Sequence, residues 1–285
     1  MIFDIDNGVL CGVRGDEEKV IIPEGVEVIS MNTFHSSSVK ELVLPESLKR
    51  IERYAFCSCD NLISVKIPDG VERIDAFAFG GCRNLKEIIL PESLKRIRNS
   101  CFYMDEALES VHIPGSVTRI GPQAFAYCKA LTEVTLPADL KEILDEAFRG
   151  CKKITNIEIP EGTEFVGAYA FSECDALESI VLHESIEEID DVAFLGCTSL
   201  KSITLPRSLK RISESAFCNC SDLMEIRMPE GVEVFEDNMA DVFENGNCAV
   251  RTGKGQIYFY GDPYLAEKKP DNPFKGCSRA TVVVY

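Results

Sequence analysis

The chain has 285 residues, of which 45% are hydrophobic and 27% are charged, as in an ordinary soluble globular protein. No apolar run approaches the roughly 18 residues of a membrane-spanning helix, so we expect no membrane insertion. The net charge is −17, and an acidic surface repels phosphate backbones, which argues against a nucleic-acid partner. The segment that starts at Met1 lacks the basic and apolar regions of a signal peptide, so we expect a cytoplasmic protein or a signal outside this sequence.

Residues 1–19 differ from the rest of the chain and are predicted to form an N-terminal cap. The dipeptide Asn7-Gly8 lies between apolar residues. This dipeptide favours a tight turn, because both of its residues tolerate a positive φ, so it predicts two antiparallel strands. A hairpin at this point would cover the first turn of the structure that follows.

Residues 20–245 carry a repeat that is visible in the spacing of proline. The repeat starts are Pro23, Pro45, Pro68, Pro91, Pro114, Pro137, Pro160, Pro206 and Pro229, with His183 in the single gap. The first step is 22 residues long and the following eight are 23. A fixed period of this length is typical of a solenoid, in which each turn contacts only its neighbours.

Two further positions repeat in nearly every turn. Phenylalanine stands eleven residues after the repeat start, at Phe34, Phe56, Phe79, Phe102, Phe125, Phe148, Phe171, Phe194 and Phe217. Cysteine usually stands fourteen residues after it, at Cys59, Cys82, Cys128, Cys151, Cys174, Cys197 and Cys220, with Ser37 and Asp105 as exceptions. Because stacking superimposes equal offsets, these residues are predicted to form buried ladders. We expect the cysteines to be free thiols that act as small apolar fillers.

The local pattern of each turn predicts its backbone. Alternation of apolar and polar residues, as in Val65-Lys66-Ile67, indicates a strand that ends at the proline. The Leu-Lys-Arg-Ile stretch after Pro45 favours a second short extended side, and the Ala-Phe segment is interpreted as a short helical turn. The sequence thus predicts a β-rich right-handed superhelix of about ten 23-residue turns, with a parallel sheet and short helical turns.

The register of the repeat fails after Pro229. Residues 246–285 begin with a glycine- and asparagine-rich loop, after which Ile257–Tyr260 has the pattern of a strand. The last residues, from Phe274 to Tyr285, match the second half of a repeat. We therefore predict a C-terminal cap in which the solenoid resumes after a loop.

The consensus I-x-I-P-x-x-V-x-x-I-x-x-x-A-F-x-x-C-x-x-L resembles the BspA-type leucine-rich repeat over roughly residues 20–235. This resemblance implies an α/β leucine-rich-repeat solenoid. It also implies a surface-exposed bacterial protein, since some members are adhesins for host matrix proteins or other cells, and it carries over no catalytic residue. The expected function is a non-enzymatic, monomeric scaffold that binds a protein or a glycan at the cell surface. The alternative is an intracellular interaction scaffold, which the thirteen cysteines favour.

Candidate chemical groups are sparse. The three histidines, His35, His112 and His183, share no offset with a serine, cysteine or aspartate that would form a catalytic set. The pairs that begin at Cys57 and Cys218 each contain one ladder cysteine, and they lie seven turns apart, so they do not predict a zinc site. We expect no cofactor, no metal and no catalysis.

The better functional candidate is the outward side of the predicted strands. One outward column consists of Val43, Lys66, Ile89, His112, Thr135, Glu158, Val181, Thr204 and Arg227. These residues vary from turn to turn while the core beneath them does not. A varied display on a fixed scaffold suits partner binding, although an ordinary solvated sheet has the same pattern.

The second side carries a basic stripe, which consists of Lys49, Arg50, Arg73, Lys95, Arg96, Arg119, Lys141, Lys210 and Arg211. On a chain of net charge −17 this is a local reversal of sign. It could bind an acidic partner or a polyanionic glycan. The more conservative interpretation is that it pairs with glutamates of adjacent turns, such as Glu72, Glu142 and Glu188.

Overall fold

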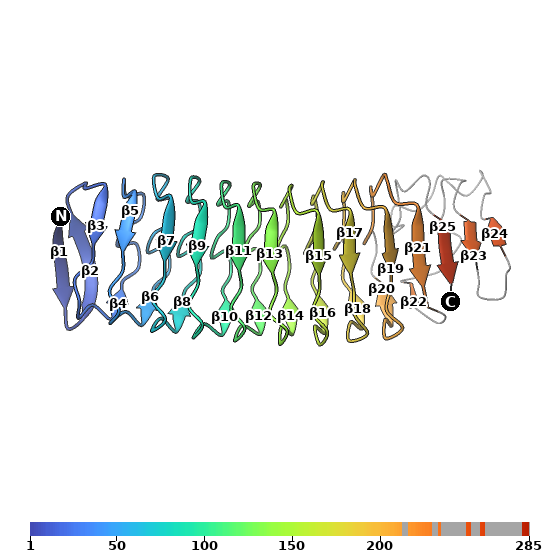
Figure 1. The fold of residues 1–285 in the computed structure, drawn as a ribbon, viewed down its shortest axis with the longest axis horizontal. Coiled ribbons are helices and arrows are strands. Elements are labelled where there is room, and N and C mark those ends of the chain that lie inside the picture. Colours follow the sequence, from blue (N-terminus) through green and yellow to red (C-terminus); the bar gives the residue numbers. More distant parts are fainter. Residues whose placement is uncertain (213–215, 230–232, 235–248, 252–256, 260–280, 285) are drawn as a thin grey trace. The chain divides into compact units, whose positions relative to one another are not determined.

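A computed structural model describes residues 1–212, 216–229, 233–234, 249–251, 257–259 and 281–284 (Figure 1). The chain divides into two units, Met1–Leu140 and Lys141–Tyr285. Both are made of the same β-solenoid turn, with about nine turns of about 23 residues in all and parallel sheets. The solenoid and its period are therefore confirmed.

The first unit has a sheet of three-residue strands, here called the long-strand face. Its strands are β3 (Lys19–Ile21), β5 (Glu41–Val43), β7 (Ser64–Lys66), β9 (Glu87–Ile89), β11 (Ser110–His112) and β13 (Glu133–Thr135). They are parallel and in register, so that Val65 lies beside Ile88 and Lys66 beside Ile89. The middle residue of each strand points inward and the two flanking residues are exposed, as the period-two alternation predicts.

Two-residue strands form a second side of the first unit, the short-strand face. They are β4 (Val28–Ile29), β6 (Arg50–Ile51), β8 (Arg73–Ile74), β10 (Arg96–Ile97) and β12 (Arg119–Ile120). Arg50 pairs with Arg73, and Arg96 pairs with Arg119, again in parallel register. The isoleucine of every strand is buried. The predicted second extended side is thus confirmed.

The second unit repeats both faces. Its long-strand face has β15 (Asn156–Glu158), β17 (Ser179–Val181), β19 (Ser202–Thr204) and β21 (Glu225–Met228). Its short-strand face has β14 (Glu142–Ile143), β16 (Phe165–Val166), β18 (Glu188–Ile189), β20 (Arg211–Ile212) and β22 (Glu233–Val234). Strand β25 (Thr281–Val284) pairs in parallel with β21, whereas most of the predicted C-terminal cap lies outside the described residues. Strand β24 (Ile257–Phe259), which was predicted, pairs antiparallel with β23 (Ala249–Arg251).

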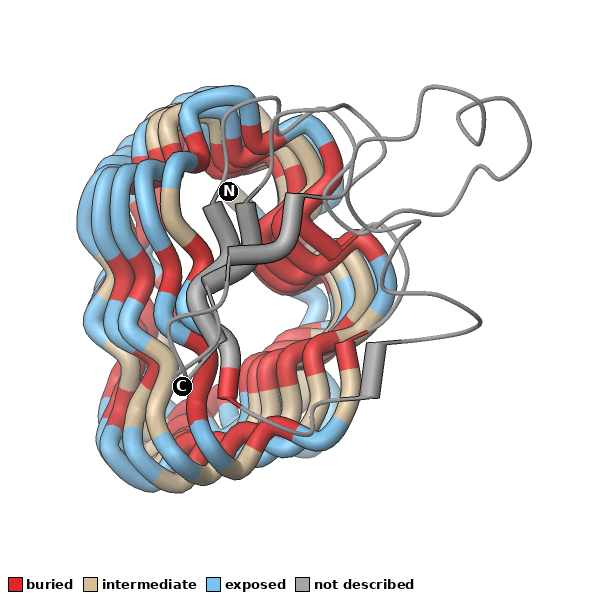
Figure 2. Tube along the Cα trace, turned by 90° about the vertical axis from the view of Figure 1, so that its right-hand side faces the viewer, coloured by how far each residue is buried: buried red, intermediate tan, exposed pale blue. Residues whose placement is uncertain are grey.

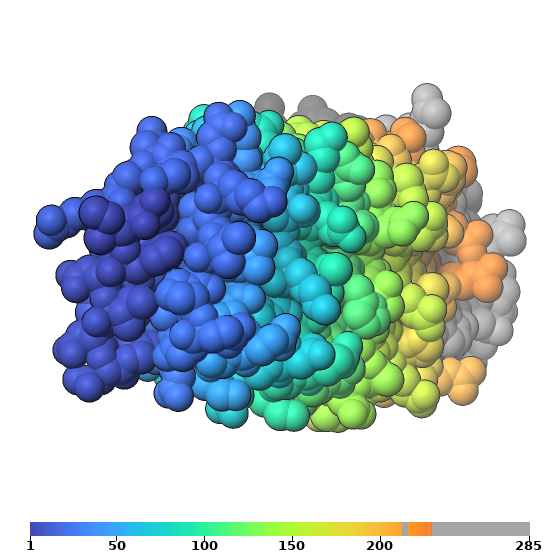
Figure 3. Space-filling model, turned by 60° about the vertical axis from the view of Figure 1, so that its left-hand side comes forward, coloured from blue at the N-terminus to red at the C-terminus, as the bar shows by residue number. Residues whose placement is uncertain are grey.

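The N-terminal hairpin is also confirmed. Strands β1 (Ile2–Asp6) and β2 (Val9–Arg14) are antiparallel, and β2 pairs in parallel with β4. The turn between them has φ of 48° at Asn7 and 80° at Gly8, which is the positive pair that a tight hairpin turn requires. In Figure 3 these dark blue residues form the end of the first unit.

The short helical turns predicted around each phenylalanine are wrong, because no helix occurs among the described residues. The backbone N–H groups near Phe56 alternate between two directions. Those of Ala55 and Cys57 donate within the turn, to the carbonyls of Glu52 and Tyr54. The N–H of Phe56 instead donates to the carbonyl of Ala78 in the next turn. Since an α-helix keeps all these bonds within one segment, the stacking of turns excludes it.

The backbone around each phenylalanine therefore makes two consecutive tight turns, here called the double turn. In each repeat it has two residues in the left-handed conformation, one two residues before the phenylalanine and one two residues after it. Tyr54 and Ser58, which flank Phe56, have φ of 59° and 58°. Glycine occupies the second position at Gly81, Gly150 and Gly196, where it adopts this conformation without a Cβ penalty.

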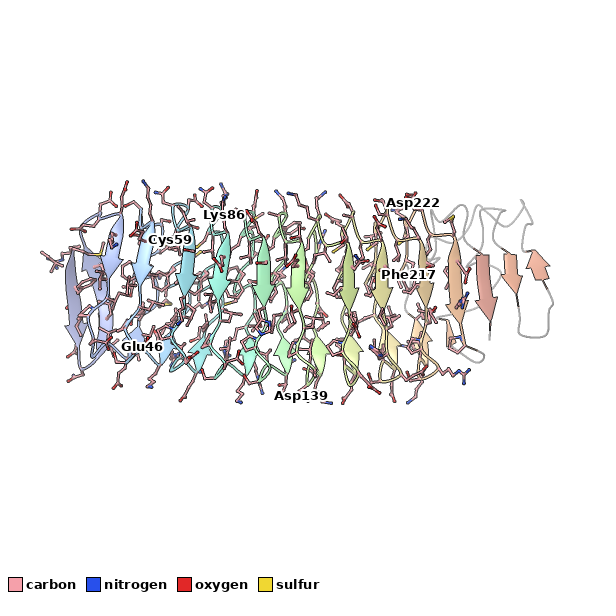
Figure 4. All side chains as sticks on the ribbon, in the orientation of Figure 1. Glu46, Cys59, Lys86, Asp139, Phe217 and Asp222 are labelled. Atoms are coloured by element: carbon pink, nitrogen blue, oxygen red, sulfur yellow. The ribbon has the colours of Figure 1, made fainter. Side chains whose placement is uncertain are left out.

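The core lies inside the turns, where the buried residues line the interior (Figure 2). The phenylalanine rings stack within each unit, with Phe125 fully buried and its centroid 5.2 Å from that of Phe102. Phe171 lies between Phe148 at 5.5 Å and Phe194 at 5.6 Å. Of the residues labelled in Figure 4, Cys59 and Phe217 are fully buried, whereas Lys86 and Glu46 are exposed. Both predicted ladders are confirmed as buried columns.

Candidate binding surfaces

The long-strand face of the first unit presents the predicted column to solvent. Val43, Lys66, Ile89, His112 and Thr135 are all exposed, one per strand. Each follows a residue that points inward, so the face displays five different side chains on a repeated backbone. The structure thus confirms the outward position of these residues, whereas their role in binding stays a prediction.

Apolar side chains are concentrated on this face. Ile21 is 59% exposed, Val43 48% and Ile89 49%. Ile21 pairs with Val43 between β3 and β5, so it belongs to the same column, although it was not predicted as a site residue. Its position two residues before Pro23 matches that of Val43 before Pro45 and could have identified it. Exposed apolar residues that adjoin on one sheet are more informative than isolated ones.

The second unit carries Glu158, Val181, Thr204 and Arg227 in the same outward column, and all four are exposed. This part of the column is more polar. The carboxylate of Glu158 lies 3.3 Å from Nε2 of His183, and the side chain of Arg227 contacts Glu225. The two units therefore display different chemistry at equivalent positions.

The described residues were searched for metal-ligand clusters and for membrane-spanning helices. Within them, no three histidine, cysteine or carboxylate side chains are placed to hold a metal ion. None of their segments is a helix with the length and apolar character to cross a bilayer.

The ladder cysteines are packing groups. In the first unit the Cys128 thiol donates to the Phe102 carbonyl at 3.2 Å, and in the second the Cys174 thiol donates to the Phe148 carbonyl at 3.3 Å. Burial raises the pKa of the Cys174 thiol to about 12 and that of the Cys128 thiol well above its usual value. Thiols held in this way are poor nucleophiles, since the thiolate is the reactive form.

Asp105 occupies the cysteine position in one turn of the first unit. Its Oδ1 atom accepts a hydrogen bond of 2.8 Å from the Cys82 backbone N–H, while Oδ2 is buried without a hydrogen-bond partner. Burial raises the pKa of this carboxyl well above its usual value. Burial therefore disfavours the charged form of this carboxyl relative to its state in water.

The basic stripe is partly neutralised by acidic residues. In the second unit, Lys210 lies 2.8 Å from Glu187, Lys141 lies 3.8 Å from Glu164, and Arg211 contacts Glu188, one of the expected partners. The two lysine pairs are exposed, so each contributes little to stability, whereas the pair of Arg211 and Glu188 is half-buried.

In the first unit the arginines instead converge on one carboxylate. Asp75 is 7% exposed and accepts hydrogen bonds from Nε of Arg50 at 3.2 Å and Nε of Arg73 at 2.6 Å. The Nε atom of Arg98 lies 3.4 Å from the same group. With Arg53, these residues line an open hollow of about 390 Å³. Asp75, Arg98 and Arg53 were not predicted as site residues, because only the turn after the short strand brings them beside Arg50 and Arg73.

The fold and its exposed faces define a repeat solenoid with display surfaces of the leucine-rich-repeat class. The chain belongs to the BspA-type leucine-rich repeat family, because a family described as "BspA type Leucine rich repeat region (6 copies)" matches residues 14–132 and 118–248. No curated protein matches the chain.

Several solved structures are similar. A leucine-rich repeat protein of Bacteroides ovatus is 21% identical, with 93% of this chain and 83% of that one covered and a TM-score of 0.50. The leucine-rich repeat protein of T. pallidum is 27% identical, with coverages of 67% and 82% and a TM-score of 0.53. A leucine-rich cell surface protein of Faecalibacterium prausnitzii is 21% identical, with coverages of 99% and 92% and a TM-score of 0.41.

Proposed function

We propose that the chain is a non-enzymatic binding module of a bacterial cell-surface protein, which recognises a protein or glycan through the long-strand face of its first unit. The main support for this proposal is the outward column, in which Ile21, Val43 and Ile89 expose apolar side chains beside Lys66 and His112. A mixture of apolar and polar groups on a rigid sheet suits recognition, because binding orders few additional side chains. The surface location is supported by the family, in which some members are adhesins.

The column can be tested with two variants of the full chain. One carries Val43→Ser and Ile89→Ser, which remove two exposed apolar side chains from the face. The matched control carries Met31→Ser, which removes an apolar side chain that is 56% exposed outside the strands. Binding is measured against immobilised matrix proteins, a glycan array and intact host cells. We expect the double variant to lose about tenfold or more in affinity for whichever probe binds the parent chain.

Equal affinity of the double variant and the parent chain would exclude this face as the binding site. Loss of affinity in Met31→Ser as well would indicate a nonspecific effect. Lys66→Glu extends the test to the charged member of the column, and Glu158→Lys and Arg227→Glu examine the second unit in the same way.

A second candidate function is an intracellular interaction scaffold. The observation that favours it is the cysteine column, since thiols are usual in reducing compartments and disulfides in oxidising ones. Protease treatment of intact producing cells separates the two candidates. A surface protein loses its signal on immunoblotting, whereas an intracellular one is protected until the cells are lysed.

A further inference from the structure

We propose that the arginine hollow of the first unit, formed by Arg50, Arg53, Arg73 and Arg98 around Asp75, binds an oxyanion group of an acidic polysaccharide. This site lies on the short-strand side and is independent of the long-strand face. The group is a sulfate ester or a carboxylate, which present the same kind of acceptor oxygens to a guanidinium.

The charge of the hollow is the first observation. Four guanidiniums face two carboxylates, those of Asp75 and of Glu52, which lies 3.4 Å from Arg50. The hollow therefore keeps an excess of positive charge on a chain whose net charge is −17. Arg50, Arg73 and Arg98 are 38%, 44% and 40% exposed, so their charges are only partly screened by water.

The second observation is the set of donors that Asp75 leaves unused. Each guanidinium has five N–H groups in a rigid fork. Arg73 gives Asp75 only its Nε–H, and Arg98 approaches the same carboxylate through Nε. Within the described residues, the terminal nitrogens of Arg73 and Arg98 make no hydrogen bond. They are available for an incoming oxyanion in the bidentate geometry that arginine favours.

The third observation is that the arginines are already positioned. Asp75 is buried, lines the hollow and accepts hydrogen bonds from the Nε atoms of Arg50 and Arg73, so Asp75 is a positioning residue. Arg53 is positioned by Tyr54 instead of Asp75. Its guanidinium lies 4.9 Å from the centre of the Tyr54 ring and donates to the Tyr54 hydroxyl at 3.1 Å. An ordered site loses less side-chain entropy on binding than a flexible basic patch.

Size and register favour a polysaccharide over a folded acidic protein. A hollow of about 390 Å³ is at the lower end of small-molecule sites, which are roughly 300–1,000 Å³, and suits a group the size of one sugar. Arg50 and Arg73 stand on paired strands, which are about 4.8 Å apart in a sheet. Successive anionic groups along an extended chain can therefore meet successive turns.

The test uses the full chain and four defined polymers. Dextran sulfate supplies only sulfate esters, polygalacturonate only carboxylates, neutral dextran no charge, and polyglutamate an acidic polypeptide. We expect binding to dextran sulfate, to polygalacturonate or to both, none to neutral dextran, and weaker binding to polyglutamate. Which of the charged polysaccharides binds more tightly identifies the oxyanion.

Two variants locate the binding. Arg73→Gln with Arg98→Gln should weaken the preferred polysaccharide by about tenfold or more, because two forked donors are lost. The matched control, Lys152→Gln with Lys201→Gln, removes two exposed ion-paired cations from the second unit that lie outside the basic stripe and should change affinity less than about twofold. If the double arginine variant does not fold, Arg53→Gln replaces it, since Arg53 has no carboxylate partner among the described residues.

Three results would overturn the proposal: no binding to either charged polysaccharide, equal weakening in the lysine control, or unchanged binding in the arginine variants. Tighter binding to polyglutamate than to both polysaccharides would identify an acidic protein partner instead and would also reject it. Failure of this experiment leaves the long-strand face untouched, because the serine variants of that face are assayed separately.

Discussion

The short-strand faces of the two units differ in charge although both repeat the same two-residue strand. The first unit places an arginine at the outer position of four consecutive strands, β6, β8, β10 and β12, whereas the second has Glu142, Phe165, Glu188 and Arg211 at that position. The inner position is isoleucine or valine in both units. Only the inner residue is constrained by stacking, so the outer residue can change without cost to the core. The two units therefore share a scaffold but present different charges on it.

If the cores of the two units are packed in the same way, their ladder thiols should be equally protected from chemical modification. Reaction with an alkylating reagent requires local opening of a buried turn, so we expect Cys128 and Cys174 to react about a thousandfold more slowly than the exposed Cys11. Mass spectrometry of native and denatured samples measures this. Cys248, also expected to react early, lies outside the described residues. Rapid native labelling of Cys174 but not of Cys128 would show that the second unit is packed differently.

Removing one ring from either phenylalanine ladder should cost the same in both units. Phe125→Ala and Phe171→Ala each leave a cavity, and we expect a loss of about 3–5 kcal/mol in the free energy of unfolding. Urea denaturation monitored by circular dichroism measures it. Because turns couple only to their neighbours, the loss can appear as partial melting of one region. A loss below about 1 kcal/mol in either variant would contradict the ladder there.

Asp105 is a departure from the cysteine column in the first unit, and restoring the column should stabilise it. Asp105→Cys should raise the free energy of unfolding at neutral pH by about 1–3 kcal/mol, because it removes a buried carboxyl oxygen without a partner. Asp105→Asn removes the ionisable group but places an amide NH2 where that oxygen stood, so it should raise the stability less. The exposed Asp139→Asn is the matched control and should have little effect.

The effect of Asp105 should depend on pH in one direction. Since burial raises the pKa of this carboxyl in the folded state, the folded protein retains a proton that the unfolded chain releases. Its contribution to stability is therefore greatest below the ordinary carboxyl pKa and falls as the pH rises toward the raised value. Chemical denaturation across this range should show the slope in the parent chain and a smaller slope in Asp105→Asn. An identical slope in both would contradict the assignment.

The smallest expected change in stability concerns the left-handed residue that stands two positions after each phenylalanine. Gly81→Ala and Gly196→Ala should each cost about 1 kcal/mol, because φ is 81° and 73° at these positions. Gly115→Ala is the control, since its added Cβ would meet no atom within 4 Å. Thermal unfolding compares the three. A loss much larger in one unit than in the other would show that the double turns are not equivalent.

The solenoid could be predicted from the sequence because its main determinant is periodic. Equal spacing of Pro45, Pro68 and later repeat starts fixes the register, and alternation fixes which strand residues point outward. The helical turn was predicted wrongly because the sequence of an Ala-Phe segment does not show whether its backbone N–H groups bond within the same turn or to the next turn. The N–H of Phe56 bonds to the next turn, and that choice is made by stacking rather than by local propensity.

The sites were predictable to different extents. The outward column follows from a period of two, and it lacked Ile21, which precedes the 22-residue step. The arginine hollow could not be found in this way. It joins Arg50 to Arg98, which occupy different offsets in their turns, and they meet only because the chain bends after each short strand.

Strand β3 is the last strand of the six-stranded sheet in the first unit, and its outer edge has a consequence for assembly. The terminal strand of a stack of similar turns has unpaired backbone N–H and C=O groups, here called the growth front, which can pair with a strand of another copy. This front is only three residues long, and Asp16, Glu17 and Glu18 come directly before it. Like charges on two such fronts repel each other, so we expect the chain to remain a monomer rather than to polymerise into filaments.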